Sequence, residues 1–418
     1  MTFDIDAVRT RFPALAIADA ARPRVYLDNP AGTQVPRDVV DRTTACLVEA
    51  NANLGGHFAT TVAAGRIVDE ARAAMADFLG ASGPDEIVFG QNMTTLTFHV
   101  SRSIGRMLSP GDEIVVTRMD HDANIAPWLM LAEERGLAVR WLDVDPRTCE
   151  FDLSELDGVL SERTRLVAVG LASNLTGTVN DVRAIAARAR DAGALVYVDA
   201  VQFAPHGLID VANLGADFLV CSAYKVYGPH QGILWGRRDL LEQLTAYKVR
   251  PAGERAPDKF ETGTLSHEGL AGTLGAIEYL ASLGAGAEGG RRARIASAFA
   301  RISGHENALC RRLIDGLGTI PGVIIHGITN PDRMNARVPT VSFTCRGHRP
   351  RAIARALAID NIFVWDGHNY ALELVRRLGL EEGGGVVRIG LAHYNTAAEI
   401  DQAVDAVARA ASRADSLH

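Results

Sequence analysis

The sequence predicts an α/β protein with a mainly parallel sheet in a large domain and a small C-terminal α+β domain. In the first two thirds of the chain, short apolar runs alternate with helical patterns. This alternation is typical of βαβ units and of a parallel sheet that is buried on both faces. After about residue 283 the alternation stops, and a long helical pattern is followed by short strands and helices. These two observations carry the prediction of fold class.

The large domain is expected to span residues 20–283. Its strands are expected where apolar runs lie between turn residues, at 25–27, 86–89, 113–117, 138–142, 166–171, 194–199, 218–221 and 232–236. A helix over residues 182–192 is expected to end at Gly193, because glycine favours the position just after a helix.

The small domain is expected to consist of residues 1–19 and 284–418. The glycine-rich segment 284–290 is interpreted as a hinge, and a long helix is expected after it through Leu317. Strands and helices are then expected at 322–326, 338–343, 349–359, 363–364, 386–391 and 396–411. Thr396 and Glu399 form a capping box at the start of the last helix.

Composition and charge argue against several classes of protein. The formal net charge of −7 gives no general electrostatic reason to bind nucleic acid. The 5 cysteines lie at scattered spacings without a CxxC pair, so neither a zinc site nor a disulfide framework is supported and no metal is expected. The first residues lack the apolar core of a signal peptide, and no apolar run reaches membrane-span length. We therefore expect a cytoplasmic protein that binds neither membrane nor nucleic acid.

A carboxylate and a lysine follow two neighbouring strands of the expected sheet. Asp199 ends one strand, and Lys225 comes shortly after the next. Ligands gather at the carboxyl ends of parallel strands. Pyridoxal phosphate (PLP) needs a lysine for its Schiff base, a carboxylate at its pyridine nitrogen and donors for its phosphate. The pair therefore indicates a PLP site, and the structural alternative is an ion pair between two strand ends.

Three further segments fit the same cofactor. Thr94 and Thr95 follow a strand and begin a helix, where hydroxyl and N–H groups bind phosphate or simply cap the helix. His121 follows another strand, and its ring is either stacked on the pyridine or structural. Asn174, also placed after a strand, is able to donate to the phenolic oxygen of the cofactor.

These motifs resemble the class V aminotransferase superfamily of fold type I PLP enzymes, most closely its cysteine desulfurase and selenocysteine lyase branch. The resemblance runs nearly end to end, through YLDNPAG, DHDANIAPW, SNLTGTVNDV, VDAVQ, SAYK, FETGT and VRIGLAHYNT. It implies the PLP-dependent transferase fold, PLP as cofactor, an amino-acid substrate and a homodimer with shared active sites at its interface.

The resemblance also implies a role for each matching residue. Lys225 would bind PLP covalently, Asp199 would pair with the pyridine nitrogen, and His121 would stack on the ring. Contacts to the phenolic oxygen and the phosphate would come from Thr94, Thr95, Asn174, Gln202, Ser222, Tyr224 and, in the partner subunit's site, Thr264. The substrate would be bound by Arg388 through its α-carboxylate, within a pocket shaped by Asn29, His57 and Trp365. A surface salt bridge is the alternative role of Arg388.

One departure from the desulfurase pattern bears on the reaction. Desulfurases present a cysteine on a mobile loop, and that cysteine attacks the substrate sulfur. The matching stretch here is WDGHNYALELV, in which Tyr370 stands at the position of the cysteine. A phenol cannot carry a persulfide, so ordinary desulfuration is not expected. Tyr370 is expected to line the pocket or supply a proton, and packing of the loop is the alternative.

The sequence therefore favours a C–S lyase that performs β-elimination on cysteine or a cysteine S-conjugate, with Lys225 as the base. Transamination, epimerisation and decarboxylating oxidation of an amino acid are alternatives on the same fold. A catalytically idle PLP-binding scaffold is an alternative of another class. The joint presence of Lys225, Asp199, His121 and Arg388 argues against the scaffold, because an idle protein needs neither a base nor a carboxylate clamp.

Overall fold

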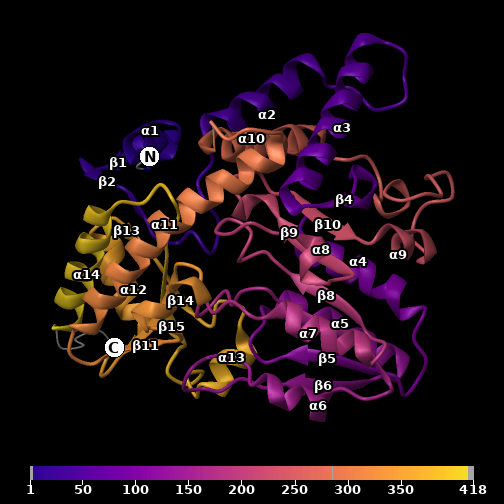
Figure 1. Ribbon diagram of the computed structural model, residues 1–418. Coiled ribbons are helices and arrows are strands. Elements are labelled where there is room, and N and C mark those ends of the chain that lie inside the picture. The colour runs from indigo at the N-terminus through magenta and orange to yellow at the C-terminus, as the bar shows by residue number, and fades with distance from the viewer. Residues whose placement is uncertain (1–2, 285, 413–418) are drawn as a thin grey trace.

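The structure is a computed structural model that describes residues 3–284 and 286–412. The strands of its large sheet are β4 (Ile87–Gly90), β5 (Glu113–Thr117), β6 (Ala138–Leu142), β7 (Thr164–Gly170), β8 (Leu195–Asp199), β9 (Phe218–Ser222) and β10 (Gly232–Gly236). They are arranged in the order β4-β10-β9-β8-β7-β5-β6. Strand β10 is antiparallel to both of its neighbours, and the other adjacent pairs are parallel. The predicted α/β fold with a mainly parallel sheet is confirmed (Figure 1).

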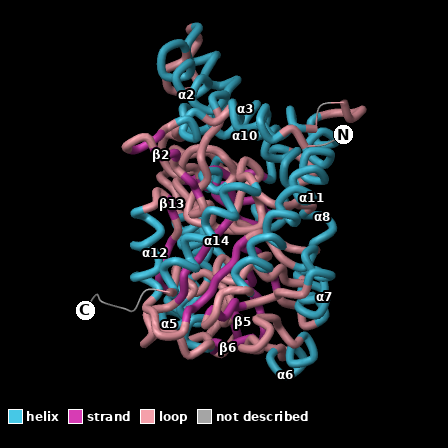
Figure 2. Tube along the Cα trace, turned by 90° about the vertical axis from the view of Figure 1, so that its left-hand side faces the viewer, coloured by secondary structure: helices cyan, strands magenta, loops and turns pink. Residues whose placement is uncertain are grey.

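Helices cover both faces of this sheet because successive strand residues point to opposite sides. Val115 packs into a core with helices α3 (Ala59–Leu79), α7 (Val182–Asp191) and α10 (His267–Leu283). Its neighbours Ile114 and Val116 pack into a second core with α4 (Met93–Gly105) and α5 (Ala126–Arg135). Figure 2 shows β5 and β6 between α5 on one side and α7 on the other.

A smaller antiparallel sheet lies beside the first (Figure 1). Its strands, in the order β11-β12-β15-β14, are β11 (Val323–His326), β12 (Thr340–Cys345), β15 (Val386–Gly390) and β14 (Trp365–Gly367). Helices α11 (Arg291–Gly318), α12 (Pro350–Ile359) and α14 (Ala397–Ala411) share one apolar core with it. The predicted capping box of Thr396 and Glu399 begins α14.

The remaining elements are short or peripheral. They are α1 (Ile5–Thr10), β1 (Ala18–Asp19), β2 (Arg22–Pro23), β3 (Val25–Tyr26), α2 (Arg37–Glu49), α6 (Leu156–Val159), α8 (Val211–Leu214), α9 (Arg238–Gln243), β13 (Ile362–Phe363) and α13 (Leu372–Arg377). Between residues 3–284 and 286–412, no helix combines the length and hydropathy of a bilayer-crossing segment.

The first predicted strand, residues 25–27, does not join the large sheet. It forms β3, which pairs with β13, because Val25 and Leu27 pack into the core of the small sheet. In contrast, Val8 and Phe12 from the N-terminal segment pack into a core of the large sheet. The short strand β14 was not predicted. The hinge expected over 284–290 contains Ala285, which lies outside the described residues, and the domain boundaries remain a prediction.

Candidate active site

A cavity of about 660 Å³ lies where β5, β7, β8 and β9 end. Most of the predicted site residues line it, namely Thr94, Thr95, His121, Asn174, Asp199, Gln202, Ser222, Tyr224, Lys225, Trp365, Tyr370 and Arg388. Six strands of the large sheet run in one direction, so the side chains that follow their carboxyl ends converge at one edge.

Lys225 and Asp199 lie in the cavity without forming an ion pair with one another. Asp199 is the last residue of β8, and its Oδ1 accepts a hydrogen bond from the Val201 N–H over 2.9 Å. Lys225 lies in the turn after β9 and donates to the Pro30 carbonyl. Burial lowers the pKa of Lys225 to about 7 and raises the pKa of Asp199 to about 7. A neutral amine at Lys225 is therefore accessible near neutral pH.

His121 is held as a neutral ring. Its Nδ1 accepts a hydrogen bond from the Ala123 N–H over 3.0 Å, which assigns the ring proton to Nε2. Burial lowers the pKa of His121 to about 4, since the charged form would lose its hydration. The ring is stacked with Tyr370, with centroids 5.3 Å apart and planes inclined by 17°. Both aromatic rings line the cavity.

Arg388, on β15, is a buried cation with unused hydrogen-bonding capacity. Its Nη1 donates to the Asn174 carbonyl over 3.0 Å, and its Nη2 lies 3.6 Å from Oδ1 of Asp28. Its Nε is buried and has no hydrogen-bond partner among the residues that the structure describes. Burial lowers its pKa to about 10, so the guanidinium still stays charged at neutral pH. A buried guanidinium that lines a cavity fits a carboxylate and does not fit a surface salt bridge.

The start of α4 borders the same cavity. Asn92 and Thr95 form a capping box, in which the Thr95 hydroxyl is already hydrogen-bonded to the Asn92 backbone. The Met93 N–H donates to Oγ of Ser222 over 2.9 Å. Gly232 of β10 passes directly beneath, where a Cβ would come 2.6 Å from the Asn92 carbonyl carbon. A helix start with hydroxyls around it suits an anionic phosphate.

The two predicted amide contacts to the phenolic oxygen are engaged within the chain. Nδ2 of Asn174 donates to the Asn369 carbonyl over 2.7 Å, and Nε2 of Gln202 donates to Oγ1 of Thr340 over 2.9 Å. Each amide nitrogen carries a second hydrogen that these bonds do not use. Both side chains line the cavity, so their predicted contacts to a cofactor remain a proposal.

Three predicted residues do not line this cavity. Asn29 is buried behind it, where its Nδ2 donates to the Tyr26 and Gly390 carbonyls over 3.0 and 2.8 Å and its Oδ1 accepts from the Tyr394 hydroxyl. The predicted substrate contact of Asn29 is therefore replaced by a structural role. His57 and Thr264 are exposed on the surface of this chain.

Sequence reasoning missed four polar residues of the cavity: Asn92, Asp120, His230 and Asn369. Asp120 is buried, and its carboxylate accepts hydrogen bonds of 2.7 Å from the Thr117 hydroxyl and the Asn124 amide. Its position just after β5, next to His121 in the sequence, could have indicated that it lies in the site. His230 stacks on Tyr224 with centroids 4.7 Å apart, and no local pattern pointed to it.

The donor set fits PLP. The cavity offers a lysine that forms no ion pair with a carboxylate of the described residues, a buried carboxylate on a neighbouring strand and a helix start. Asn174 Oδ1 and Arg388 Nε are buried there and have no hydrogen-bond partner in the described part of the chain, so both are available to a ligand. The residues that would hold the cofactor are therefore Lys225, Asp199, His121 and the groups around the start of α4.

Asp199 provides a test that needs no cofactor. Burial raises its folded pKa from 3.8 to about 7, so the unfolded chain releases this proton first as pH rises. Stability of the cofactor-free protein should therefore fall between about pH 4 and pH 7, by roughly 4 kcal/mol from this group. Asp199→Asn should then be more stable than wild type at pH 8 and similar at pH 4, as measured by urea unfolding.

The matched control is Asp217→Asn. The Asp217 carboxylate is also buried, but it pairs with Arg237 over 2.8 Å, so its loss should destabilise the protein at pH 8. Equal pH dependence of stability in wild type and Asp199→Asn would contradict a raised pKa of the buried Asp199 carboxyl group.

Comparison with known proteins shows similarity to PLP-dependent enzymes along nearly the whole chain. The profile of the family described as aminotransferase class-V matches residues 25–403. An aminotransferase-like protein of Gibberella zeae is 36% identical over 416 residues, which cover 97% of this chain and 98% of that protein. A cysteine desulfurase of Pectobacterium atrosepticum is 32% identical over 424 residues, which cover 98% of each protein.

Solved structures agree with the architecture. The apo structure of a cysteine desulfurase from Thermococcus onnurineus NA1 is similar with a TM-score of 0.87 and 28% identity, over 98% of each chain. The cysteine desulfurase CsdA of Escherichia coli has a TM-score of 0.84 and 29% identity, over 98% of this chain and 99% of its own. Since the family profile spans most of the sequence, the chain belongs to the class V aminotransferase family and is a PLP-dependent enzyme of fold type I.

Proposed function

We propose that this enzyme is a C–S lyase that performs β-elimination on cysteine or a cysteine S-conjugate. The observation that carries the proposal is the chemistry at the mouth of the cavity. Tyr370 lines the cavity and is stacked on His121. By the resemblance of the sequence to desulfurases, it would take the place of their cysteine. All five cysteines of the sequence fall within the described residues and are buried, and none of them lines this cavity. A sulfur atom therefore has no thiol acceptor in this site and would leave as a free thiol.

Bound PLP supplies the electron sink that stabilises negative charge at the substrate Cα. Arg388 would hold the α-carboxylate through its guanidinium, which fixes the Cα–H bond relative to Lys225. Nζ of Lys225, as a neutral amine, would take the Cα proton. The C–S bond then breaks, and its electron pair leaves with the thiolate, which is protonated to the free thiol. Addition of one water yields pyruvate and ammonia.

Product analysis with cysteine and S-methylcysteine tests this function. We expect equimolar pyruvate, ammonia and thiol (or sulfide from cysteine). Pretreatment with iodoacetamide under native conditions should leave the rate within about twofold of the untreated enzyme, because buried thiols react slowly. Alanine together with a protein persulfide, or strong inactivation by iodoacetamide, would overturn the proposal.

Transamination is the second candidate, because the Gibberella zeae relative is named aminotransferase-like. It would convert the cofactor to its amine form and release a 2-oxo acid without loss of the β-substituent. Three further measurements distinguish epimerisation, oxidation and an idle scaffold from the lyase. Deuterium uptake at Cα without consumption identifies an epimerase, and carbon dioxide release identifies decarboxylating oxidation. Absence of any spectral change with a broad amino-acid panel identifies an idle scaffold.

A homodimer is part of the same proposal. Helix α2 and the segment that joins it to α3 expose large apolar side chains, namely Leu47, Val48, Leu54 and Phe58. Figures 1 and 2 show α2 at the periphery of the molecule. Exposed apolar groups of this kind mark contact surfaces. His57 lies within this region, and we assign His57 and Thr264 to the partner subunit's active site.

Val48→Asp should therefore weaken association. Val48 is 77% exposed in the single chain, so the change costs little in the monomer but places a charge in an apolar interface. Sedimentation velocity should show a dimer for wild type and a shift towards monomer for the variant. The control Ile359→Asp, at a similarly exposed apolar residue on α12, should leave the dimer intact. A wild-type monomer would contradict this part of the proposal.

A further inference from the structure

The short helix α13 follows Tyr370 and is anchored to the large sheet on its apolar side. Leu374 and Val375 are fully buried in a small apolar cluster with Ala371. The cluster also contains Met119, which follows β5, and Val144, which follows β6. The segment that carries Tyr370 thus packs against two loops of the large sheet.

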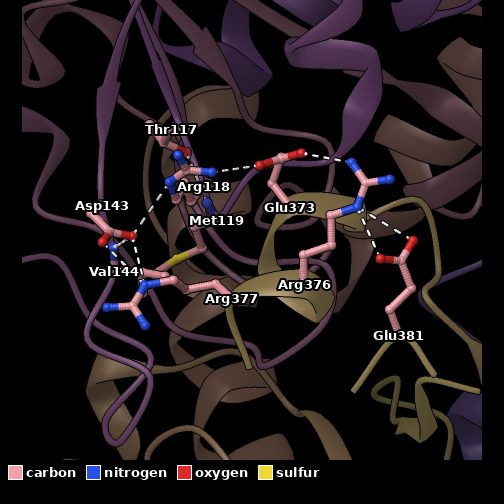
Figure 3. Close-up of polar contacts among 9 residues, drawn as sticks. All are labelled: Thr117, Arg118, Met119, Asp143, Val144, Glu373, Arg376, Arg377 and Glu381. Carbon is pink, nitrogen blue, oxygen red and sulfur yellow. Dashed lines mark hydrogen bonds and ion pairs between the residues drawn. The ribbon is translucent and has the colours of Figure 1, made fainter. Parts of the chain in front are cut away.

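A chain of ion pairs fastens the polar side of the same helix (Figure 3). Oε2 of Glu373 lies 2.6 Å from Arg118, and its Oε1 lies 3.1 Å from Arg376. Arg118 reaches in turn towards Asp143, whose carboxylate also accepts a hydrogen bond from Arg377 over 3.0 Å. Glu373 is mostly buried, at 17% exposure of its side chain, and both of its oxygens are occupied. Linked, partly buried pairs of this kind hold more firmly than isolated surface pairs.

The turn that α13 supports has an unfavourable backbone. Asn369 and Tyr370 have φ angles of 50° and 59°, in the left-handed region that non-glycine residues avoid. Such residues persist only where their surroundings fix them. Two contacts do so on the cavity side: Asn174 donates to the Asn369 carbonyl, and the Asp122 N–H donates to the Tyr370 carbonyl over 2.8 Å. The ion pairs of α13 fix the other end.

We propose that Glu373 is a positioning residue, which holds Tyr370 stacked on His121 at the mouth of the cavity. It does so by tying α13 to Arg118, which lies three residues before His121 in the same loop. One ion pair thereby links the two loops that carry the two stacked rings. The link acts on the shape of the cavity and does not depend on which bond of the substrate is broken.

Hydrogen exchange of Glu373→Gln tests the link without substrate. Two backbone amides report on the Tyr370 turn: the Asp122 N–H donates to the Tyr370 carbonyl, and the Ala371 N–H donates to the His368 carbonyl. Their exchange should accelerate by about tenfold in the variant, because local opening of the turn becomes easier. Arg118→Gln breaks the same link from the other loop and should give the same result. About 0.5 M salt should accelerate exchange in wild type but have little further effect in either variant.

The matched control is Glu381→Gln. Glu381 also pairs with Arg376, over 3.1 Å, but within residues 3–284 and 286–412 its carboxylate forms no hydrogen bond or ion pair with the loops of the large sheet. The hydrogen exchange pattern and the activity of Glu381→Gln should match those of wild type. In the PLP-loaded enzyme, Glu373→Gln should lower kcat/KM by about tenfold or more at an unchanged midpoint of thermal unfolding.

The inference would be overturned if the amides of Asp122 and Ala371 exchanged at the wild-type rate in Glu373→Gln. It would also be overturned if their exchange accelerated equally in Glu381→Gln. A failure of the lyase proposal would appear only in the products and would leave the exchange result intact.

Discussion

Lys225→Ala is expected to lower kcat by about 10³-fold or more, since it removes the only amine in the described cavity that could take the Cα proton. The variant should also lose the covalent attachment of PLP, so the cofactor should be released on dialysis while wild type retains it. Product formation under saturating PLP and the absorbance of the dialysed protein measure the two effects. Added methylamine should restore part of the rate, because a small amine fits the space left by the side chain.

The control for Lys225 is Lys259, a lysine that is buried away from the site. Its Nζ donates to the Glu242 and Leu244 carbonyls over 2.8 and 3.0 Å, away from the cavity. Lys259→Ala should lower stability and leave kcat per folded molecule within about twofold, because no reacting atom is near it. Activity above about a tenth of wild type in Lys225→Ala would show that another group is the base.

Arg388→Met is expected to lower kcat/KM for S-methylcysteine by about 100-fold, because a bidentate charge-assisted contact to the α-carboxylate is lost. Most of the loss should appear in KM. The corresponding cysteamine thioether, which lacks the carboxylate, should bind wild type and variant with similar affinity. The variant should therefore bind the ligands with and without a carboxylate with similar affinity.

A second variant guards against damage to the fold, because Arg388→Met leaves Asp28 without its cationic neighbour. Arg388→Lys keeps the charge but loses the planar fork, and it should recover stability with only part of the substrate affinity. An equal loss for both ligands in both variants would contradict a carboxylate-binding role for Arg388.

Local sequence patterns predicted the structure well where a single strand and the polar residue after it determine the position of a side chain. The runs at 113–117, 138–142 and 232–236 became strands with those bounds, and the order of strands and helices gave the parallel sheet. Asp199 and Lys225 could be placed together because parallel strands end at the same edge. Arg388 required the resemblance to a family as well, since a lone arginine on a strand has no distinctive pattern.

Other features depended on contacts between distant segments. Residues 25–27 have the pattern of any buried strand, and only packing against the small-sheet core placed them beside β13. Asn29 is polar and lies near the site in sequence, but its amide is consumed by Tyr26, Gly390 and Tyr394. Gly390 and Tyr394 lie 361 and 365 residues from Asn29 along the chain, so these two hydrogen bonds cannot be read from local pattern.

By itself, the sequence determined the fold class, the cofactor chemistry and the absence of a cysteine at position 370, because these follow from residue identity and strand order. The tertiary structure decided how Tyr370 is held. Its stacking on His121 and the ion pair between Glu373 and Arg118 join segments some 250 residues apart. Such a contact depends on the distance between two loops in space, which no periodicity or motif along the chain encodes.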